Sequence, residues 1–229
     1  MARKKTESWS DDAERQTKDA DHLKGMEKAS GDAVRIVIPP LDLRVVKFSL
    51  EGDSPLICHR FSEKAKKMIR DKQSKQASPG REKRNPEAEY EASFYRMPDG
   101  RAAVPTIWFK AAMVEAVTSL GRTISKTSVR QAFHILGPLV PVDGVKPSMR
   151  EDIVRLQGIS RPVDLRYRPE FPAGWRVTLT FRFNAQAISP EQLAHLLNLA
   201  GFAVGAGEWR TQKGGDMGAY HVAETEKTA

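Results

Sequence analysis

Cysteines, long apolar runs and metal-ligand spacings are almost absent from this sequence of 229 residues. The single cysteine, Cys58, excludes an intramolecular disulfide and a zinc cluster built from cysteines. The histidines are scattered without the short spacings of metal ligands, so we expect no metal site. No apolar run reaches the length of a membrane span, and the N-terminus lacks the apolar core of a signal peptide. We therefore expect a cytoplasmic protein without membrane contact.

Acidic residues are also fewer than basic ones. Lysine and arginine number 37 against 29 acidic residues, which gives a net charge of +8 and a pI near 9.6. This surplus favours an anionic partner such as nucleic acid or an acidic surface, although it does not indicate a fold. The length suits one sizeable domain with a real core. Neither a Walker loop nor a Rossmann fingerprint is present, and nothing suggests a small-molecule cofactor.

The two ends of the chain differ in composition from its middle. Residues 1–33 are polar, of mixed charge and nearly devoid of branched apolar side chains, so we expect a disordered or extended basic N-terminal arm. Order should begin near residue 34, with 34–38 as a short edge strand or an extended arm. Residues 34–223 should form a single domain, and 224–229 a polar tail.

Hydrophobic periodicity predicts six core elements in the middle of the chain. Strands are expected at 43–50, 135–142, 176–184 and 218–222, and helices at 106–120 and 190–200. This β-α-β-β-α-β order predicts an α+β protein with a ferredoxin-like, RRM-type core, in which two helices cover one face of an antiparallel sheet. Two insertions, at about 52–104 and 143–174, then interrupt the core. The first contains a hairpin signal at Asp99-Gly100, and the second is expected to be loop-rich.

A dense run of basic residues follows the first predicted strand. From residue 61 a helical pattern carries a thin apolar stripe surrounded by lysine and arginine. The simpler interpretation is a solvated helix, which is what most charge runs are. Acidic residues nearby are too few to neutralise the run, however, and a polyanion would relieve the repulsion between like charges. We favour a basic inserted thumb that contacts nucleic acid.

The stretch from Ile188 to Val222 predicts a capped helix, a glycine-studded turn and a last strand. Ser189 and Gln192 form a capping box, and Gly201 is the expected left-handed end of the helix.

The glycines after that helix allow two interpretations. They either form a nest of backbone amides for anionic oxygen or merely let the last strand re-enter the sheet, and the spacing favours neither. In the first interpretation Arg210 and Lys213 supply charge, and Trp209 offers a face for stacking. A phosphate backbone would use all three.

Two stretches carry a resemblance to a known family. Residues 104–112, Val-Pro-Thr-Ile-Trp-Phe-Lys-Ala-Ala, resemble the I-P-x-S-S-x-K-G start of a helix in the repeat-associated mysterious protein (RAMP) superfamily of CRISPR systems. Ala111 stands in place of the glycine of that motif. Residues 189–222 are similar to the C-terminal glycine-rich loop and last strand of the superfamily.

The resemblance implies a non-catalytic, guide-RNA-binding backbone subunit of an RNA-guided ribonucleoprotein used in antiviral defence. Backbone members polymerise along the RNA and hold it with an inserted thumb, which here would be 52–104. Base pairing of the RNA reads a complementary target, while the protein reads backbone shape. Self-association and contact with other effector subunits are therefore expected. The candidate RNA-binding residues are Arg60, Lys64, Lys67, Arg70, Lys110, Arg122, Lys126, Arg130, Arg161, Arg166, Arg168, Trp209, Arg210, Lys213, Gly214 and Gly215.

Two alternatives stay open at this stage. One is a metal-independent endoribonuclease that processes precursor guide RNA, with His59 as general base or acid, or with Asp53 in a role at a bound target. A turn position for Asp53 and a loop position for His59 are the simpler interpretations. The other alternative is a single-stranded DNA-binding protein, because charge alone does not distinguish the two polymers.

Overall fold

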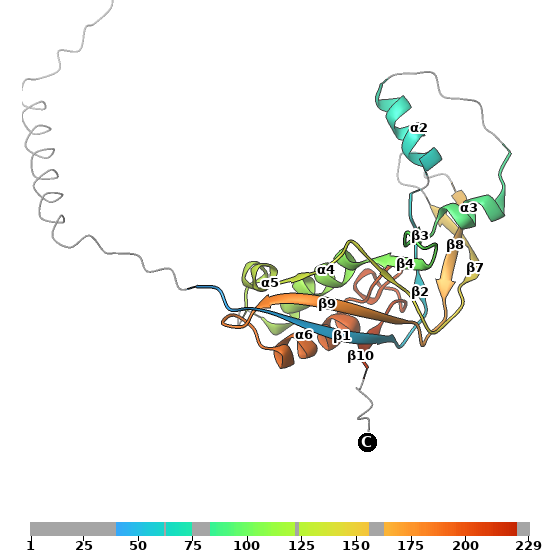
Figure 1. The fold of residues 1–229 in the computed structure, drawn as a ribbon. Helices are drawn as coiled ribbons and strands as arrows, with labels where there is room; N and C mark the ends of the chain where they lie inside the picture. The colour runs from blue at the N-terminus through green and yellow to red at the C-terminus, as the bar shows by residue number, and fades with distance from the viewer. Residues whose placement is uncertain (1–39, 62, 75–82, 122–123, 156–162, 224–229) are drawn as a thin grey trace, which may run out of the picture. The chain divides into compact units, whose positions relative to one another are not determined.

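The computed structural model describes residues 40–61, 63–74, 83–121, 124–155 and 163–223 (Figure 1). The chain divides into two units between residues 40 and 41, and the helices and strands described below belong to the second. The predicted N-terminal arm (1–33), the predicted strand at 34–38 and the polar tail lie outside the described residues.

A four-stranded antiparallel sheet forms the centre of the second unit. Its strands are β1 (Leu43–Gly52), β5 (Phe133–Ile135), β9 (Arg176–Asn184) and β10 (Tyr220–Val222). Their order across the sheet is β10-β1-β9-β5. The long pair β1 and β9 runs in register from Leu43 opposite Asn184 to Glu51 opposite Arg176. The first and third core strands are thus central, as a ferredoxin-like core requires.

Two helices connect these strands and pack against each other. They are α4 (Thr106–Ala116), continued by the 3-10 turn η1 (Val117–Leu120), and α6 (Pro190–Ala203). The apolar alternation of β9 from Val177 to Phe183 is buried in one cluster with residues of both helices. The observed architecture is therefore α+β, with antiparallel sheets and the element order expected of a ferredoxin-like core.

The start of α6 agrees with its prediction, but its end does not. Both hydrogen bonds of the Ser189–Gln192 capping box are present. Gly201 is not the left-handed terminator, because the helix continues to Ala203 and the first positive φ comes at Gly205 (75°). Gly201 instead allows close packing against the last strand, since a Cβ at this position would lie 1.8 Å from the Tyr220 carbonyl oxygen.

Two small antiparallel sheets are built mainly from the insertions, and here two predictions were wrong. One sheet contains β3 (Tyr95–Arg96), β4 (Ala102–Pro105) and β6 (Leu139–Pro141), and the other β2 (Leu56–Ile57), β7 (Ser148–Arg155) and β8 (Val163–Phe171). The strand predicted at 135–142 is split at Gly137 (φ 82°) and Pro138, so that its halves join different sheets. The region 143–174 is not loop-rich, since β7 and β8 pair over eight residues each.

The described part of the chain contains three further α-helices. They are α2 (Glu63–Gln73), α3 (Pro86–Ala92) and α5 (Lys126–Ala132). The described part of the basic run is helical from Glu63 to Gln73, as predicted. A thumb that grips a strand remains a prediction for this insertion.

Candidate nucleic-acid interface

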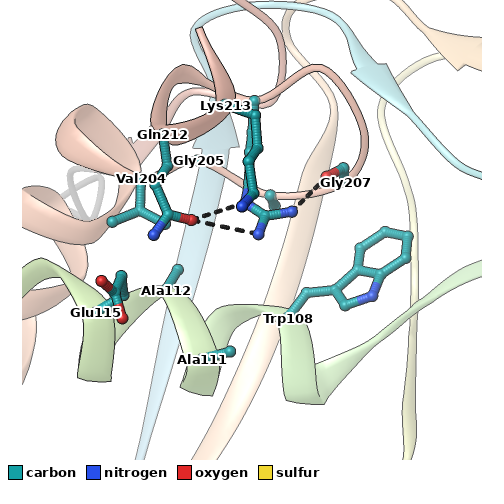
Figure 2. Close-up of a pocket in the computed structure, with 11 residues that line it drawn as sticks. Trp108, Ala111, Ala112, Glu115, Val204, Gly205, Gly207, Gln212 and Lys213 are labelled. Carbon is teal, nitrogen blue, oxygen red and sulfur yellow. Dashed lines mark hydrogen bonds between the residues drawn. The ribbon is translucent and has the colours of Figure 1, made fainter. Parts of the chain in front are cut away.

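The two stretches that carry the family resemblance meet at a cavity of about 270 Å³ (Figure 2). Trp108, Ala111, Ala112 and Glu115 line it from one side of α4. We call residues 204–218 the glycine-rich turn. Its first part forms the other side of the cavity, with residues 204–207, Arg210, Gln212 and Lys213. Residues about 100 positions apart in the sequence therefore share one concave surface.

Arg210 is held at this cavity by neutral partners. Its Nη1 donates to the Gly207 carbonyl oxygen at 3.2 Å, and its Nε and Nη2 donate to Oε1 of Gln212 at 3.4 and 3.3 Å. Neither of these partners carries a negative charge that would offset the charge of the guanidinium. Lys213, at the end of the 3-10 turn η2 (Thr211–Lys213), is exposed at the same cavity.

The acidic side chain of the cavity wall is neutralised at the same time. Glu115 accepts from the Lys126 Nζ at 2.9 Å. Lys126 therefore compensates the carboxylate that would otherwise repel a phosphate. With Arg210 and Lys213, the cavity carries a positive balance.

The glycine-rich turn is built as a tight turn and not as a nest of free amides. Nine backbone amides between residues 205 and 218 donate to protein carbonyl oxygens: those of Gly205, Ala206, Glu208, Gln212, Lys213, Gly214, Gly215, Met217 and Gly218. These amides are consequently not available to an anion. The interpretation that the glycines let the last strand re-enter the sheet is the one that the geometry supports.

Close backbone contacts explain most of these glycines. A Cβ would lie 2.5 Å from the Ile57 carbonyl oxygen at Gly207, and 1.8 Å from the Trp209 carbonyl oxygen at Gly215. This close contact gives Gly215 a packing role, and the expected RNA contact there stays a prediction. Gly214 differs, because it is exposed and a Cβ there would meet nothing within 4 Å.

Arg168 was predicted to contact RNA, and this was wrong. Its side chain is 1% exposed and donates to the carboxylates of Asp152 and Glu208. A guanidinium enclosed in this way serves the fold, because it offers no donor at the surface. It joins β8 to β7 and to the glycine-rich turn.

Arg168 helps to lower the pKa of both carboxylates. Burial alone would raise the pKa of Asp152, but hydrogen bonds from Arg150 and Arg168 outweigh it and hold the pKa below its usual range. Burial would likewise raise the pKa of Glu208, and a hydrogen bond with His59 and the charge of Arg168 lower it. Both groups are thus ionised partners at neutral pH.

Lys110, another RNA-binding candidate, lies on α4 but is not among the residues that line the cavity. Its Nζ lies 5.7 Å from the centre of the Phe133 ring, on β5. Burial and the charge of Arg130, on α5, lower the pKa of Lys110. These two residues form a separate basic position.

The remaining candidates divide by location. Arg60 pairs with Glu63 at 3.2 Å, and Lys64, Lys67 and Arg70 lie on α2, none of whose described residues lines the cavity. Arg166 lies with its Nη1 3.5 Å from Nδ1 of His59. Arg122 and Arg161 lie outside the described residues.

Each of the two candidate catalytic residues lies close to another ionisable side chain. His59 is half-buried, with Nδ1 3.5 Å from the Glu208 carboxylate. Asp53 Oδ1 lies 2.6 Å from Nδ1 of His221, and both side chains are about half exposed. The Asp53–His221 pair was missed at the sequence level, because it depends on the register that sets Gly52 opposite Tyr220.

Within the described part of the chain, no cluster of three His, Cys, Asp or Glu side chains could hold a metal ion. None of the helices in that part has both the length and the apolar character to cross a bilayer.

Similarity to known proteins is found at the level of structure. No family model and no curated protein matches the sequence. Among solved structures, the chain is similar to the crystal structure of Cmr6 from Pyrococcus furiosus, with 10% sequence identity and a TM-score of 0.44. The match covers 80% of this chain and 100% of that chain. A likeness at this level carries no information about a ligand or an activity.

Proposed function

We propose that this chain is a non-catalytic RNA-binding subunit that coats a guide RNA as an oligomer in an RNA-guided, CRISPR-like effector. The observation that carries the proposal is the cavity where Arg210 and Lys213 face α4. The two stretches that resemble the RAMP superfamily form its two sides. Guide RNA is named as the ligand because of that resemblance, and the net charge of +8 supports a polyanionic partner.

The geometry favours contact with the phosphate backbone. Arg210 and Lys213 provide two cations at one concave surface, and the Lys126–Glu115 pair removes the nearest opposing charge. Contacts of this kind fix the position of a strand without reading its sequence. Sequence would then be read by pairing of the bound RNA with a complementary target, and neighbouring copies would align along the strand with other effector subunits.

The proposal predicts a salt-dependent affinity with an identifiable contribution from Lys213. Replacing Lys213 with alanine should weaken binding to single-stranded RNA and reduce the slope of log K against log salt by about 0.7, because one phosphate contact is lost. Fluorescence anisotropy of a labelled single-stranded RNA, titrated at several KCl concentrations, measures both quantities. Lys146→Ala removes the same charge from an exposed loop residue outside the cavity and should leave the slope unchanged.

Two results would contradict the proposal. One is a wild-type affinity that does not change with salt, and the other is an equal change of slope in both lysine variants. Competition between RNA and DNA of one sequence distinguishes an RNA-binding subunit from a single-stranded DNA-binding protein. Sequencing the nucleic acid that copurifies with the protein identifies the natural ligand.

A second candidate function is favoured by the Asp53–His221 pair. An aspartate bonded to one nitrogen of an imidazole orients the ring, and the other nitrogen can then take the proton of a ribose 2′-hydroxyl. If the chain is such a metal-independent endoribonuclease, the wild-type protein should cleave RNA in the presence of EDTA. Both Asp53→Asn and His221→Gln should abolish the cleavage. Gel analysis of an end-labelled RNA measures it, with His59→Ala as the control. Intact RNA after incubation with wild-type protein would argue against any nuclease.

A further inference from the structure

Trp209 occupies a strained position in the glycine-rich turn. Among the described residues it is the one non-glycine residue with a positive φ, at 56°. Its side chain is 46% exposed, although a large apolar ring gains free energy from burial. Backbone strain of this kind persists only where the surroundings impose it, and it concentrates at ligand sites.

Contacts on both sides of Trp209 impose the strain. On one side, the Glu208 amide donates to the Ile57 carbonyl oxygen at 3.0 Å, and the Glu208 carboxylate accepts from buried Arg168. On the other side, the Met217 amide donates to the Trp209 carbonyl oxygen at 3.1 Å. The ring is therefore presented at the surface by a backbone that has little freedom to withdraw it.

A fixed cation lies beside the ring. The guanidinium carbon of Arg150 is 5.9 Å from the centre of the Trp209 ring. Arg150 is itself held in place, because its Nε donates to Asp152 at 2.9 Å and its Nη1 to Glu170 at 2.5 Å. Asp152 also accepts from Arg168, so one network around the buried Arg168 holds both the cation and the backbone under the ring.

We propose that Trp209, together with Arg150, is a stacking platform for one unpaired nucleobase of a single-stranded nucleic acid. Arg168 is its positioning residue, since it fixes Glu208 and Asp152 at the same time. This inference rests on the proposed function and adds a contact with a base to the contacts with phosphates. Every base has a π face, so the platform tolerates any sequence and serves RNA and DNA alike.

The test compares strands with and without bases. Wild-type protein should bind a short single-stranded RNA about 5 to 100 times more tightly than the abasic strand of the same length, and the same holds for DNA. Trp209→Ala should bind both strands with nearly the abasic affinity, and Trp209→Phe should recover part of the preference. Phe202→Ala removes an aromatic ring that is 80% exposed on α6 and should leave the preference unchanged.

The positioning role of Arg168 is tested through its partner. Glu208→Gln should reduce the preference for intact bases while affinity for the abasic strand stays within about twofold. Equal affinity of wild-type protein for intact and abasic strands would overturn the platform and leave the phosphate contacts standing. The platform is also overturned if Trp209→Ala keeps the preference, or if it changes only the mass of the assembly, since the ring would then cover a protein partner. Failure to bind either strand would overturn the proposed function itself.

Discussion

Replacing Arg168 with methionine should lower the free energy of unfolding by about 3 kcal/mol. The substitution removes a cation that is 1% exposed and leaves the carboxylates of Asp152 and Glu208 without it. An unpaired buried charge costs far more than the net value of the pair, because its desolvation is no longer offset. Arg150 still donates to Asp152, which keeps the loss at the lower end of the range for broken buried ion pairs. Urea unfolding at neutral pH measures it.

A neighbouring arginine of the same strand provides the control. Arg166→Met removes a half-buried guanidinium whose Nη1 lies 3.5 Å from Nδ1 of His59. This substitution should lower the free energy of unfolding by less than about 1 kcal/mol. If both variants lose the same stability, the network around Arg168 has no special role. Adding Asp152→Leu to Arg168→Met should recover part of the loss, because the unpaired carboxylate is removed as well.

The same network makes stability depend on pH with a defined sign. The pKa values of Asp152 and Glu208 are held below those of the unfolded chain, so their contribution is present above the unfolded values and is lost as pH falls through the folded ones. The difference between wild type and Arg168→Met should therefore be largest near neutral pH and shrink in acid. A difference that grows on acidification would contradict the assignment of ionised partners.

The central elements could be predicted because each is specified locally. In β9, apolar residues from Val177 to Phe183 alternate with polar ones, and its bounds were predicted at both ends. The capping box at Ser189 likewise fixes the start of α6 within four residues of sequence. Elements of this kind need no knowledge of their neighbours.

The β7–β8 hairpin could not be predicted in the same way, because it buries charge and not an apolar stripe. Its register sets Arg150 opposite Arg168, with Asp152 and Glu170 supplying the acidic partners. Along the sequence these residues resemble solvated positions, and only the pairing of strands shows that one arginine is enclosed. The wrong expectation for Arg168 follows from this.

The glycine-rich turn shows the same limit at the candidate site. The carbonyl that approaches Gly207 belongs to Ile57, about 150 residues earlier in the chain. No local spacing reveals such a partner, so the sequence left the nest and the tight turn equally open. The charges at Arg210 and Lys213 were recognised because they are adjacent in sequence to the glycines.

Two glycines of the same turn separate the cost of a left-handed backbone from the cost of a steric clash. Gly214 and Gly218 have similar positive φ values, 79° and 70°. A Cβ at Gly214 would meet nothing within 4 Å, whereas at Gly218 it would lie 1.8 Å from the Ala206 carbonyl oxygen. Gly214→Ala should therefore lower the free energy of unfolding by about 1 kcal/mol, which is the penalty of an alanine in the left-handed conformation.

Gly218→Ala should cost about 3 kcal/mol or more, because the backbone of the turn must move in addition to the left-handed penalty. The Gly218 carbonyl oxygen also accepts from the Ala206 amide, and its amide donates to the Pro55 carbonyl oxygen at 2.7 Å, so a shift there breaks the link between the turn and the residue before β2. Thermal unfolding of both variants measures the difference. RNA affinity should fall with Gly218→Ala and persist with Gly214→Ala, since the turn positions Arg210 whereas Gly214 supplies no free amide. If the two variants are equally stable, the backbone of the turn adjusts to a Cβ at Gly218 without a cost in free energy. The glycine-rich turn would then not be a rigid wall of the cavity beside α4.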